Sequence, residues 1–188
     1  MILPNKITIA RVCMIPLFMI VLMCGANYEW PYYHIWSAII FAIASMTDGI
    51  DGHIARSRGL VTDFGKFMDP LADKLLVCTA LICFIQLDLI PAYMAVIIIA
   101  REFIVTGLRT IAASKGIVMA AIMTGKIKTV IQMIAIICTM VFSKGLLPVG
   151  EICGYPAIGF VTMAISTLFT IYSGYEYIAK NVNLIKDM

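Results

Sequence analysis

The chain has 188 residues, of which 62% are hydrophobic and 13% charged, and its mean hydropathy is +0.98. Soluble globular proteins are about 45–50% apolar and about 25% charged, so this composition excludes a soluble enzyme, a disordered chain and a fibrous repeat. The formal net charge of +3 is too small to indicate nucleic-acid binding. Because the apolar runs approach the roughly 20 residues that cross a bilayer, we expect an integral membrane protein that is helical throughout.

Six apolar segments follow one another, and no linker, repeat or low-complexity tract separates them. They predict an all-α bundle of six transmembrane helices in a single domain, residues 1–188, with helices at about 7–25, 34–56, 62–87, 92–114, 121–142 and 155–179. The first segment has an alternative interpretation as a secretory signal peptide cleaved near Ala26.

Lys and Arg are distributed unevenly between the predicted loops. The loops at 26–33 and 88–91 contain neither residue, and the fifth loop contains Lys144. The other side receives Lys6, Arg11, Arg56, Arg58, Lys66, Lys115, Lys126, Lys128, Lys180 and Lys186. Because positive charge is retained on the cytoplasmic side, we expect a multi-pass protein of the cytoplasmic membrane, surrounded by membrane lipid, with both termini in the cytoplasm.

Four aspartates lie in the second and third segments, near their predicted cytoplasmic ends. Asp48 and Asp51 are three residues apart, and Asp69 and Asp73 are four apart, so each pair shares a helix face. In an antiparallel hairpin that turns near residue 60, Asp48 reaches the depth of Asp73, and Asp51 that of Asp69. The pattern therefore predicts that four carboxylates converge in a polar active-site cavity that faces the cytoplasm.

Four carboxylates at one depth repel one another and are costly to ionise away from water. Hard divalent cations remove that cost, because Mg²⁺ and Mn²⁺ prefer oxygen ligands. Two such ions can activate an attacking oxygen and stabilise a leaving oxygen in phosphoryl transfer. We therefore expect the four aspartates to bind two divalent ions. The alternative is a set of ion pairs with Arg56, Lys66 and Lys74 that holds the helices together.

These residues resemble the signature of a known family. Residues 48–56 read D-G-I-D-G-H-I-A-R, and after eight further residues 65–73 read G-K-F-M-D-P-L-A-D. The signature of the CDP-alcohol phosphotransferases is D-x-x-D-G-x-x-A-R, eight residues, then G-x-x-x-D-x-x-x-D, and every fixed position is filled here. Members move a phosphatidyl or related group from a CDP-linked lipid to an alcohol and release CMP, so the resemblance implies an enzyme and, further, a homodimer.

The resemblance also implies roles for single residues. The four aspartates match the ligands of the two metal ions, and Asp73 matches the proposed general base that deprotonates the acceptor hydroxyl. The positions that match the family's CDP-lipid contacts are Asn5, Thr8, Gly52, Arg56 and Thr62. Asn5 and Thr8 lie in the run P-N-K-I-T at 4–8, which resembles the family's P-N-x-x-T, and helix capping is the alternative role for both.

A second group of charges bears on the acceptor. Arg101 and Arg109 are eight residues apart and so lie nearly on one stripe of the fourth segment. Lys126 and Lys128 open the fifth segment about 200° apart around the helix, so we expect one of them to face inward. These residues suit a phosphate dianion, because arginine binds phosphate through two N–H groups. The alternative for Arg101 is an ion pair with Glu102.

The strings R-E-F-I-V-T-G-L-R at 101–109 and G-K-I-K-T at 125–129 are similar to those of the family branch that makes phosphatidylglycerophosphate. This second resemblance implies CDP-diacylglycerol and sn-glycerol 3-phosphate as the substrates. Inositol phosphate is the nearest competing acceptor, and serine is a weaker one. An ion- or proton-coupled transporter is the non-enzyme alternative, but the charges crowd one end of the bundle, whereas a conduction path should reach both faces.

Overall fold

Six α-helices follow one another along the chain: α1 (Leu3–Asn27), α2 (Tyr33–Ser57), α3 (Asp63–Gln86), α4 (Ala92–Ser114), α5 (Met123–Val141) and α6 (Ala157–Lys180). The computed structural model describes the backbone of residues 3–57, 63–114, 122–142 and 150–182, and the side chains of 11–46, 71–72, 74–114, 122–142 and 150–182. All six predicted helices are confirmed, and each end lies within four residues of its predicted position.

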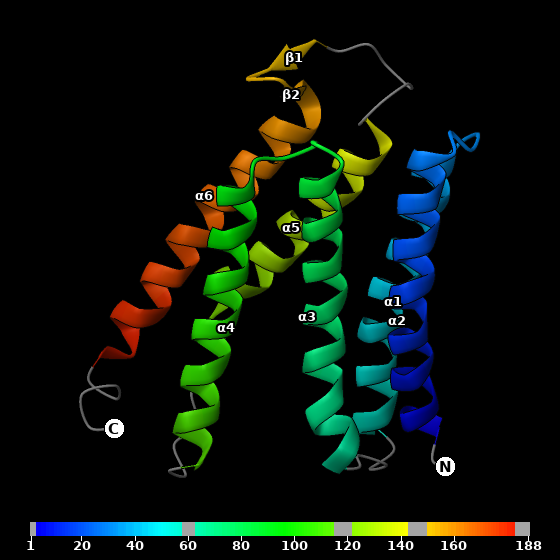
Figure 1. Ribbon diagram of the computed structural model, residues 1–188. Helices are drawn as coiled ribbons and strands as arrows, with labels where there is room; N and C mark the ends of the chain where they lie inside the picture. The colour runs from blue at the N-terminus through cyan, green and yellow to red at the C-terminus, as the bar shows by residue number, and fades with distance from the viewer. Residues whose placement is uncertain (1–2, 58–62, 115–121, 143–149, 183–188) are drawn as a thin grey trace.

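Successive helices run in opposite directions (Figure 1). Helix α1 begins and helix α6 ends at the same end of the bundle, where α2 ends and α3 begins. Helix α1 packs against α2 and α3, α6 packs against α4 and α5, and α5 also contacts α2. This up-and-down order brings the last turns of α2, the first turns of α3 and the end of α4 to one end of the molecule.

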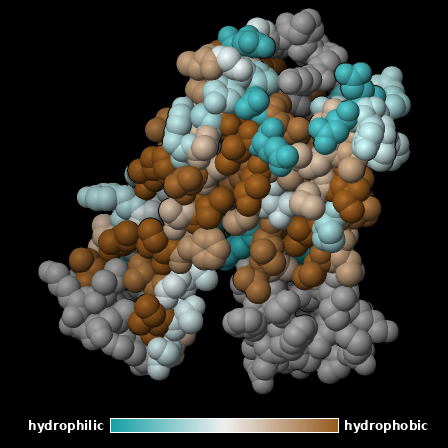
Figure 2. All heavy atoms as spheres, viewed as in Figure 1, coloured by the Kyte–Doolittle hydropathy of each residue, from teal (hydrophilic) through white to brown (hydrophobic). Residues whose placement is uncertain are grey.

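Apolar side chains fill the interior and also cover much of the outside. Phe18, Phe41 and Phe84 are fully buried in the core, whereas Ile82 and Leu168 are 57% and 68% exposed. Figure 2 shows hydrophobic residues spread across the middle of the bundle, with hydrophilic residues gathered at its upper end. An apolar surface of this extent is characteristic of a bundle that is surrounded by lipid.

Two of the described helices, α5 and α6, are long and apolar enough to cross a membrane, judged by length and composition. Shorter apolar stretches lie within α1, α2 and α3, at Arg11–Asn27, Tyr33–Met46 and Lys74–Gln86. Helix α4 has 23 residues but carries three charged residues, Arg101, Glu102 and Arg109. The structure is therefore consistent with a helical membrane protein, and two of the charges of α4, Arg101 and Glu102, lie near the middle of that helix.

A small hairpin precedes α6, where the sequence predicts no strands. Strand β1 (Glu151–Ile152) pairs antiparallel with β2 (Tyr155–Pro156). The two turn residues, Cys153 and Gly154, have φ values of 55° and 81°, and positive φ at both central residues is what a type I′ hairpin turn requires. Four paired residues are too few to produce a pattern of alternating hydrophobicity, and the predicted all-α class is unchanged.

Two basic residues that the charge distribution assigns to the cytoplasmic side are inside the bundle. Arg11 is 2% exposed and Lys128 is 1% exposed. Both lie within helices, at the ninth residue of α1 and the sixth of α5, rather than in the connections that follow them. A buried cation needs a compensating partner, so their charges serve the interior instead of marking the membrane surface.

Candidate active site

Helix α6 holds the first arginine of α4. Arg101 donates a hydrogen bond of 2.8 Å from Nη2 to Ser173 Oγ, and its Nη1 lies 3.8 Å from Glu102 Oε1. The stem of the side chain runs over Gly174, where a Cβ atom would lie 3.1 Å from Arg101 Cγ. The absence of a side chain at Gly174 therefore makes room for the arginine, and Ser173 orients its guanidinium.

The second arginine of the stripe is held by the same face of α6. Arg109 donates from Nε to Tyr177 Oη at 3.1 Å, and its guanidinium carbon lies 5.1 Å from the centre of the Tyr177 ring. This combines a hydrogen bond with a cation–π contact. Tyr177 is 2% exposed, whereas Arg109 is exposed. The arginine is thus anchored on one side by Tyr177 and exposed on the other.

The arginine stripe that the sequence predicts is confirmed, but its partners on α6 are not predicted by the sequence. Ser173, Gly174 and Tyr177 occupy positions i, i+1 and i+4 of α6. The sequence feature that could have predicted these contacts is the spacing of small and hydroxyl-bearing residues along one helix face, because such faces are where membrane helices approach closely.

One lysine of α5 faces inward, as predicted, and it is Lys128. Its ammonium forms an ion pair with Glu102 Oε1 across the helices, and the Lys128 side chain is fully buried. Lys126, two residues earlier, is exposed. The ion pair between Arg101 and Glu102, which the sequence offers as the alternative role of Arg101, is therefore present. Lys128 lies closer to the Glu102 carboxylate than Arg101 does.

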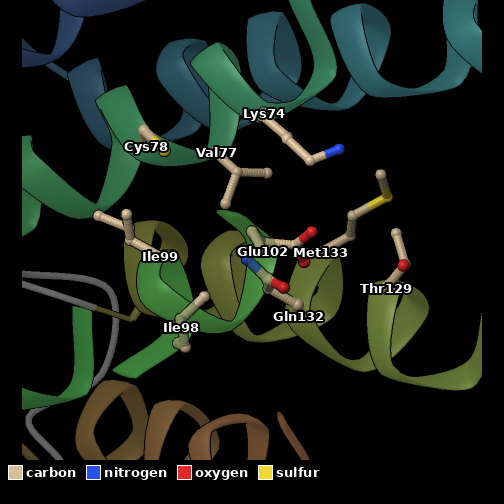
Figure 3. Close-up of a pocket in the computed structure, with 9 residues that line it drawn as sticks. All are labelled: Lys74, Val77, Cys78, Ile98, Ile99, Glu102, Thr129, Gln132 and Met133. Atoms are coloured by element: carbon tan, nitrogen blue, oxygen red, sulfur yellow. The ribbon is translucent and has the colours of Figure 1, made fainter. Parts of the chain in front are cut away.

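A small cavity of about 40 Å³ lies between α3, α4 and α5, beside this ion pair. Its lining residues are Lys74, Val77 and Cys78 of α3, Ile98, Ile99 and Glu102 of α4, and Thr129, Gln132 and Met133 of α5. In Figure 3, Lys74 and Glu102 extend into the same space from opposite helices, with Gln132 beside Glu102. Three cations and one carboxylate meet around this space, because Arg101 and Lys128 both contact Glu102.

The residues predicted to bind metal and CDP-lipid lie outside the described side chains. They are Asp48, Asp51, Asp69, Asp73, Asn5, Thr8, Gly52 and Arg56, while Thr62 lies outside the described backbone as well. Among the side chains that the structure does describe, no group of three or more His, Cys, Asp or Glu residues is placed to hold a metal ion. The metal and nucleotide assignments therefore stay predictions.

Comparison with known proteins identifies the class. Residues 1–172 match the model of the CDP-alcohol phosphatidyltransferase family, so the chain belongs to this family of enzymes. It is 47% identical to the CDP-diacylglycerol–glycerol-3-phosphate 3-phosphatidyltransferase of Bacillus subtilis (strain 168), over 98% of this chain and 97% of the relative. The protein of the same description from Rickettsia bellii (strain RML369-C) is 36% identical, over 93% and 92%. The resemblance that the sequence motifs indicate is confirmed.

Proposed function

We propose that the protein transfers the phosphatidyl group of CDP-diacylglycerol to sn-glycerol 3-phosphate, producing phosphatidylglycerophosphate and CMP. The observation that carries the choice of acceptor is the pair of arginines on α4, each anchored by a hydroxyl of α6. Such preorganised guanidinium groups suit a phosphate dianion better than they suit the neutral hydroxyl of a serine zwitterion. The descriptions of the relatives from Bacillus and Rickettsia agree with this acceptor.

The acceptor phosphate is assigned to the α4 arginines and the start of α5. Arg109 uses Nε for Tyr177, so its two terminal nitrogens can form the paired hydrogen bonds that arginine makes to phosphate. A Cβ at Gly125 would lie 3.8 Å from Arg101 Nη2, so the first turn of α5 borders the same guanidinium. Lys126 adds positive charge there, and Lys128 acts through its ion pair with Glu102.

The divalent ions are assigned to Asp48, Asp51, Asp69 and Asp73, and the helical register supports this. Ala44 of α2 is fully buried, and Asp48 follows it by one helical repeat of four residues. Val77 of α3 lines the cavity, and Asp73 precedes it by four residues. Helical periodicity therefore predicts that both aspartate pairs continue faces that point to the interior. When bound, Mg²⁺ or Mn²⁺ would stabilise negative charge on the pyrophosphate and on the leaving CMP.

In the proposed reaction, the acceptor hydroxyl oxygen attacks the lipid-side phosphorus of CDP-diacylglycerol in line with the bond to CMP. That phosphorus–oxygen bond breaks, and Asp73 accepts the proton of the attacking hydroxyl. Asn5, Thr8, Gly52, Arg56 and Thr62 are assigned to the CDP-lipid from the family signature. The arginines hold the acceptor phosphate, so that its hydroxyl is presented to Asp73 rather than diffusing freely.

We further propose six membrane spans, a cytoplasm-facing site and both termini in the cytoplasm. The antiparallel order of the helices, with α1 beginning where α6 ends, supports an even number of spans (Figure 1). The charges of α4, which reduce its hydropathy, face partners on α5 and α6. A homodimer is proposed from the family resemblance.

The test is CMP release by the purified protein with CDP-diacylglycerol and Mg²⁺ or Mn²⁺. We expect release to require sn-glycerol 3-phosphate, with phosphatidylglycerophosphate identified by mass spectrometry. Inositol phosphate and serine, supplied at the same concentrations, serve as competing acceptors. Preference for either of them would contradict the acceptor assignment, and the absence of CMP release with all three would contradict the proposed reaction.

A further inference from the structure

The cavity between α3, α4 and α5 contains a polar group without a partner among the described residues. Gln132 lines the cavity, is 3% exposed, and its Nε2 has no hydrogen-bond acceptor within the part of the chain that the structure describes. Buried amide groups are almost always hydrogen-bonded, because an unmade bond in the interior is unfavourable. An unpaired N–H that borders a cavity therefore points to a ligand.

The neighbours of Gln132 define which ligand chemistry fits. Glu102 supplies carboxylate oxygens beside the amide (Figure 3). The ion pair of Glu102 with Lys128 holds this carboxylate in place. A hydroxyl group is both a donor and an acceptor, so it can accept from Gln132 Nε2 and donate to Glu102 at the same time. A phosphate dianion offers only acceptor oxygens, so it cannot donate to the Glu102 carboxylate beside the amide. The remaining walls are mostly apolar, which suits a carbon backbone.

We propose that this cavity is the subsite for the non-reacting hydroxyl of the acceptor alcohol, read by Gln132 and Glu102. The inference depends on the proposed function, in which the acceptor is a small polyol phosphate. Arg101 and Glu102 are consecutive residues, so a phosphate on the Arg101 side and a hydroxyl on the Glu102 side fit one short molecule. In sn-glycerol 3-phosphate the group concerned is the C2 hydroxyl, adjacent to the C1 hydroxyl that reacts.

The decisive comparison uses an acceptor that lacks this hydroxyl. We would measure kcat/KM for sn-glycerol 3-phosphate and for 3-hydroxypropyl phosphate, which is the same molecule without the C2 hydroxyl. The wild-type protein should prefer glycerol 3-phosphate by roughly ten- to a hundred-fold, because the deoxy analogue leaves the buried Gln132 amide unpaired and gives Glu102 no hydroxyl donor. In Gln132→Leu this preference should fall at least about five-fold, while kcat/KM for the analogue changes less than about two-fold.

The chain offers a matched control in Gln86, an exposed residue at the end of α3. Gln86→Leu makes the same chemical change outside the cavity and should leave the preference of the wild-type protein unchanged. Leucine has nearly the volume of glutamine and removes the unpaired amide, so the melting temperature of Gln132→Leu in detergent should not fall. Gln132→Met provides a second apolar replacement of similar length.

Two outcomes would overturn the proposal. Equal losses with both acceptors in Gln132→Leu would show that Gln132 supports the structure or binds a water molecule. The proposal would also be overturned, without any variant, if the wild-type protein does not prefer glycerol 3-phosphate over its deoxy analogue. If the variants do not fold, this wild-type comparison decides. Failure of the proposed function gives a different result. Neither sn-glycerol 3-phosphate nor 3-hydroxypropyl phosphate would then be an acceptor, whereas inositol phosphate or serine would be.

Discussion

Lys128 of α5 and Glu102 of α4 form an ion pair inside the bundle, and the Lys128 side chain has no exposed surface. Arg101 approaches the same carboxylate at 3.8 Å. One acidic group thus organises two cations from two helices. Because Glu102 also borders the cavity, the ion pair connects the packing of the bundle to the geometry of the proposed acceptor site.

Removing the buried lysine should destabilise the fold, whereas removing its exposed neighbour should not. Lys128→Met breaks an interior ion pair, for which losses of about 3–5 kcal/mol in the free energy of unfolding are typical. Lys126→Met makes the same change at an exposed position and should alter that free energy by less than about 0.5 kcal/mol. Unfolding of both variants in detergent, followed by circular dichroism, measures the difference. Equal stabilities would contradict the assignment of Lys128 to the interior.

Loss of Arg109 should weaken acceptor binding and leave the lipid substrate unaffected. The acceptor phosphate develops little charge during the reaction, so Arg109→Ala should raise the KM for glycerol 3-phosphate more than it lowers kcat. A lost charged hydrogen bond of about 1.5–3 kcal/mol corresponds to roughly ten- to a hundred-fold in kcat/KM. Arg109→Lys should recover part of this, because an ammonium lacks the paired N–H groups.

Tyr177→Phe is the control for Arg109, since it removes the 3.1 Å hydrogen bond but keeps the ring beneath the guanidinium. We expect a smaller rise in the acceptor KM than in Arg109→Ala. Steady-state kinetics with each substrate varied in turn give both KM values. A rise confined to the KM for CDP-diacylglycerol would refute the assignment of Arg109 to the acceptor.

A methyl group added at Gly174 should displace Arg101. The new Cβ would lie 3.1 Å from Arg101 Cγ, so Gly174→Ala should raise the acceptor KM. Gly159→Ala is the matched control, because a Cβ there would lie 3.2 Å from Thr139 Cγ2, far along the same helix. Both changes gain similar helix propensity. An acceptor KM that rises equally in the two variants would show a general packing effect.

Chelation of divalent ions should abolish CMP release, and added Mg²⁺ or Mn²⁺ should restore it. Asp51→Asn should act mainly through metal affinity, so excess Mn²⁺ should recover part of its rate. Asp73→Asn removes both a metal ligand and the proton acceptor, and it should stay inactive at any metal concentration. Activity titrations against Mn²⁺ distinguish the two variants. Near-normal turnover by Asp73→Asn would exclude its role as the base.

Helix positions follow from the sequence because long apolar runs and helical periodicity are local properties. The arginine stripe of α4 and the divergence of Lys126 from Lys128 are predicted for the same reason. The role of Ser173 is different, because a hydroxyl inside a helix usually bonds to its own backbone, as Thr167 and Thr170 do. Whether such a hydroxyl reaches another helix depends on packing between distant segments, which a single sequence does not reveal.

The charged helix α4 has a consequence for how the protein is made. Lys128, Ser173 and Tyr177, which hold its charged side chains, are all translated after α4 itself. A charge at the centre of an isolated helix opposes membrane insertion by about 2.5–3.5 kcal/mol. We therefore expect α4 to settle in the bilayer only with the helices that follow it, so that integration of the second half of the chain is a cooperative, late event in biogenesis.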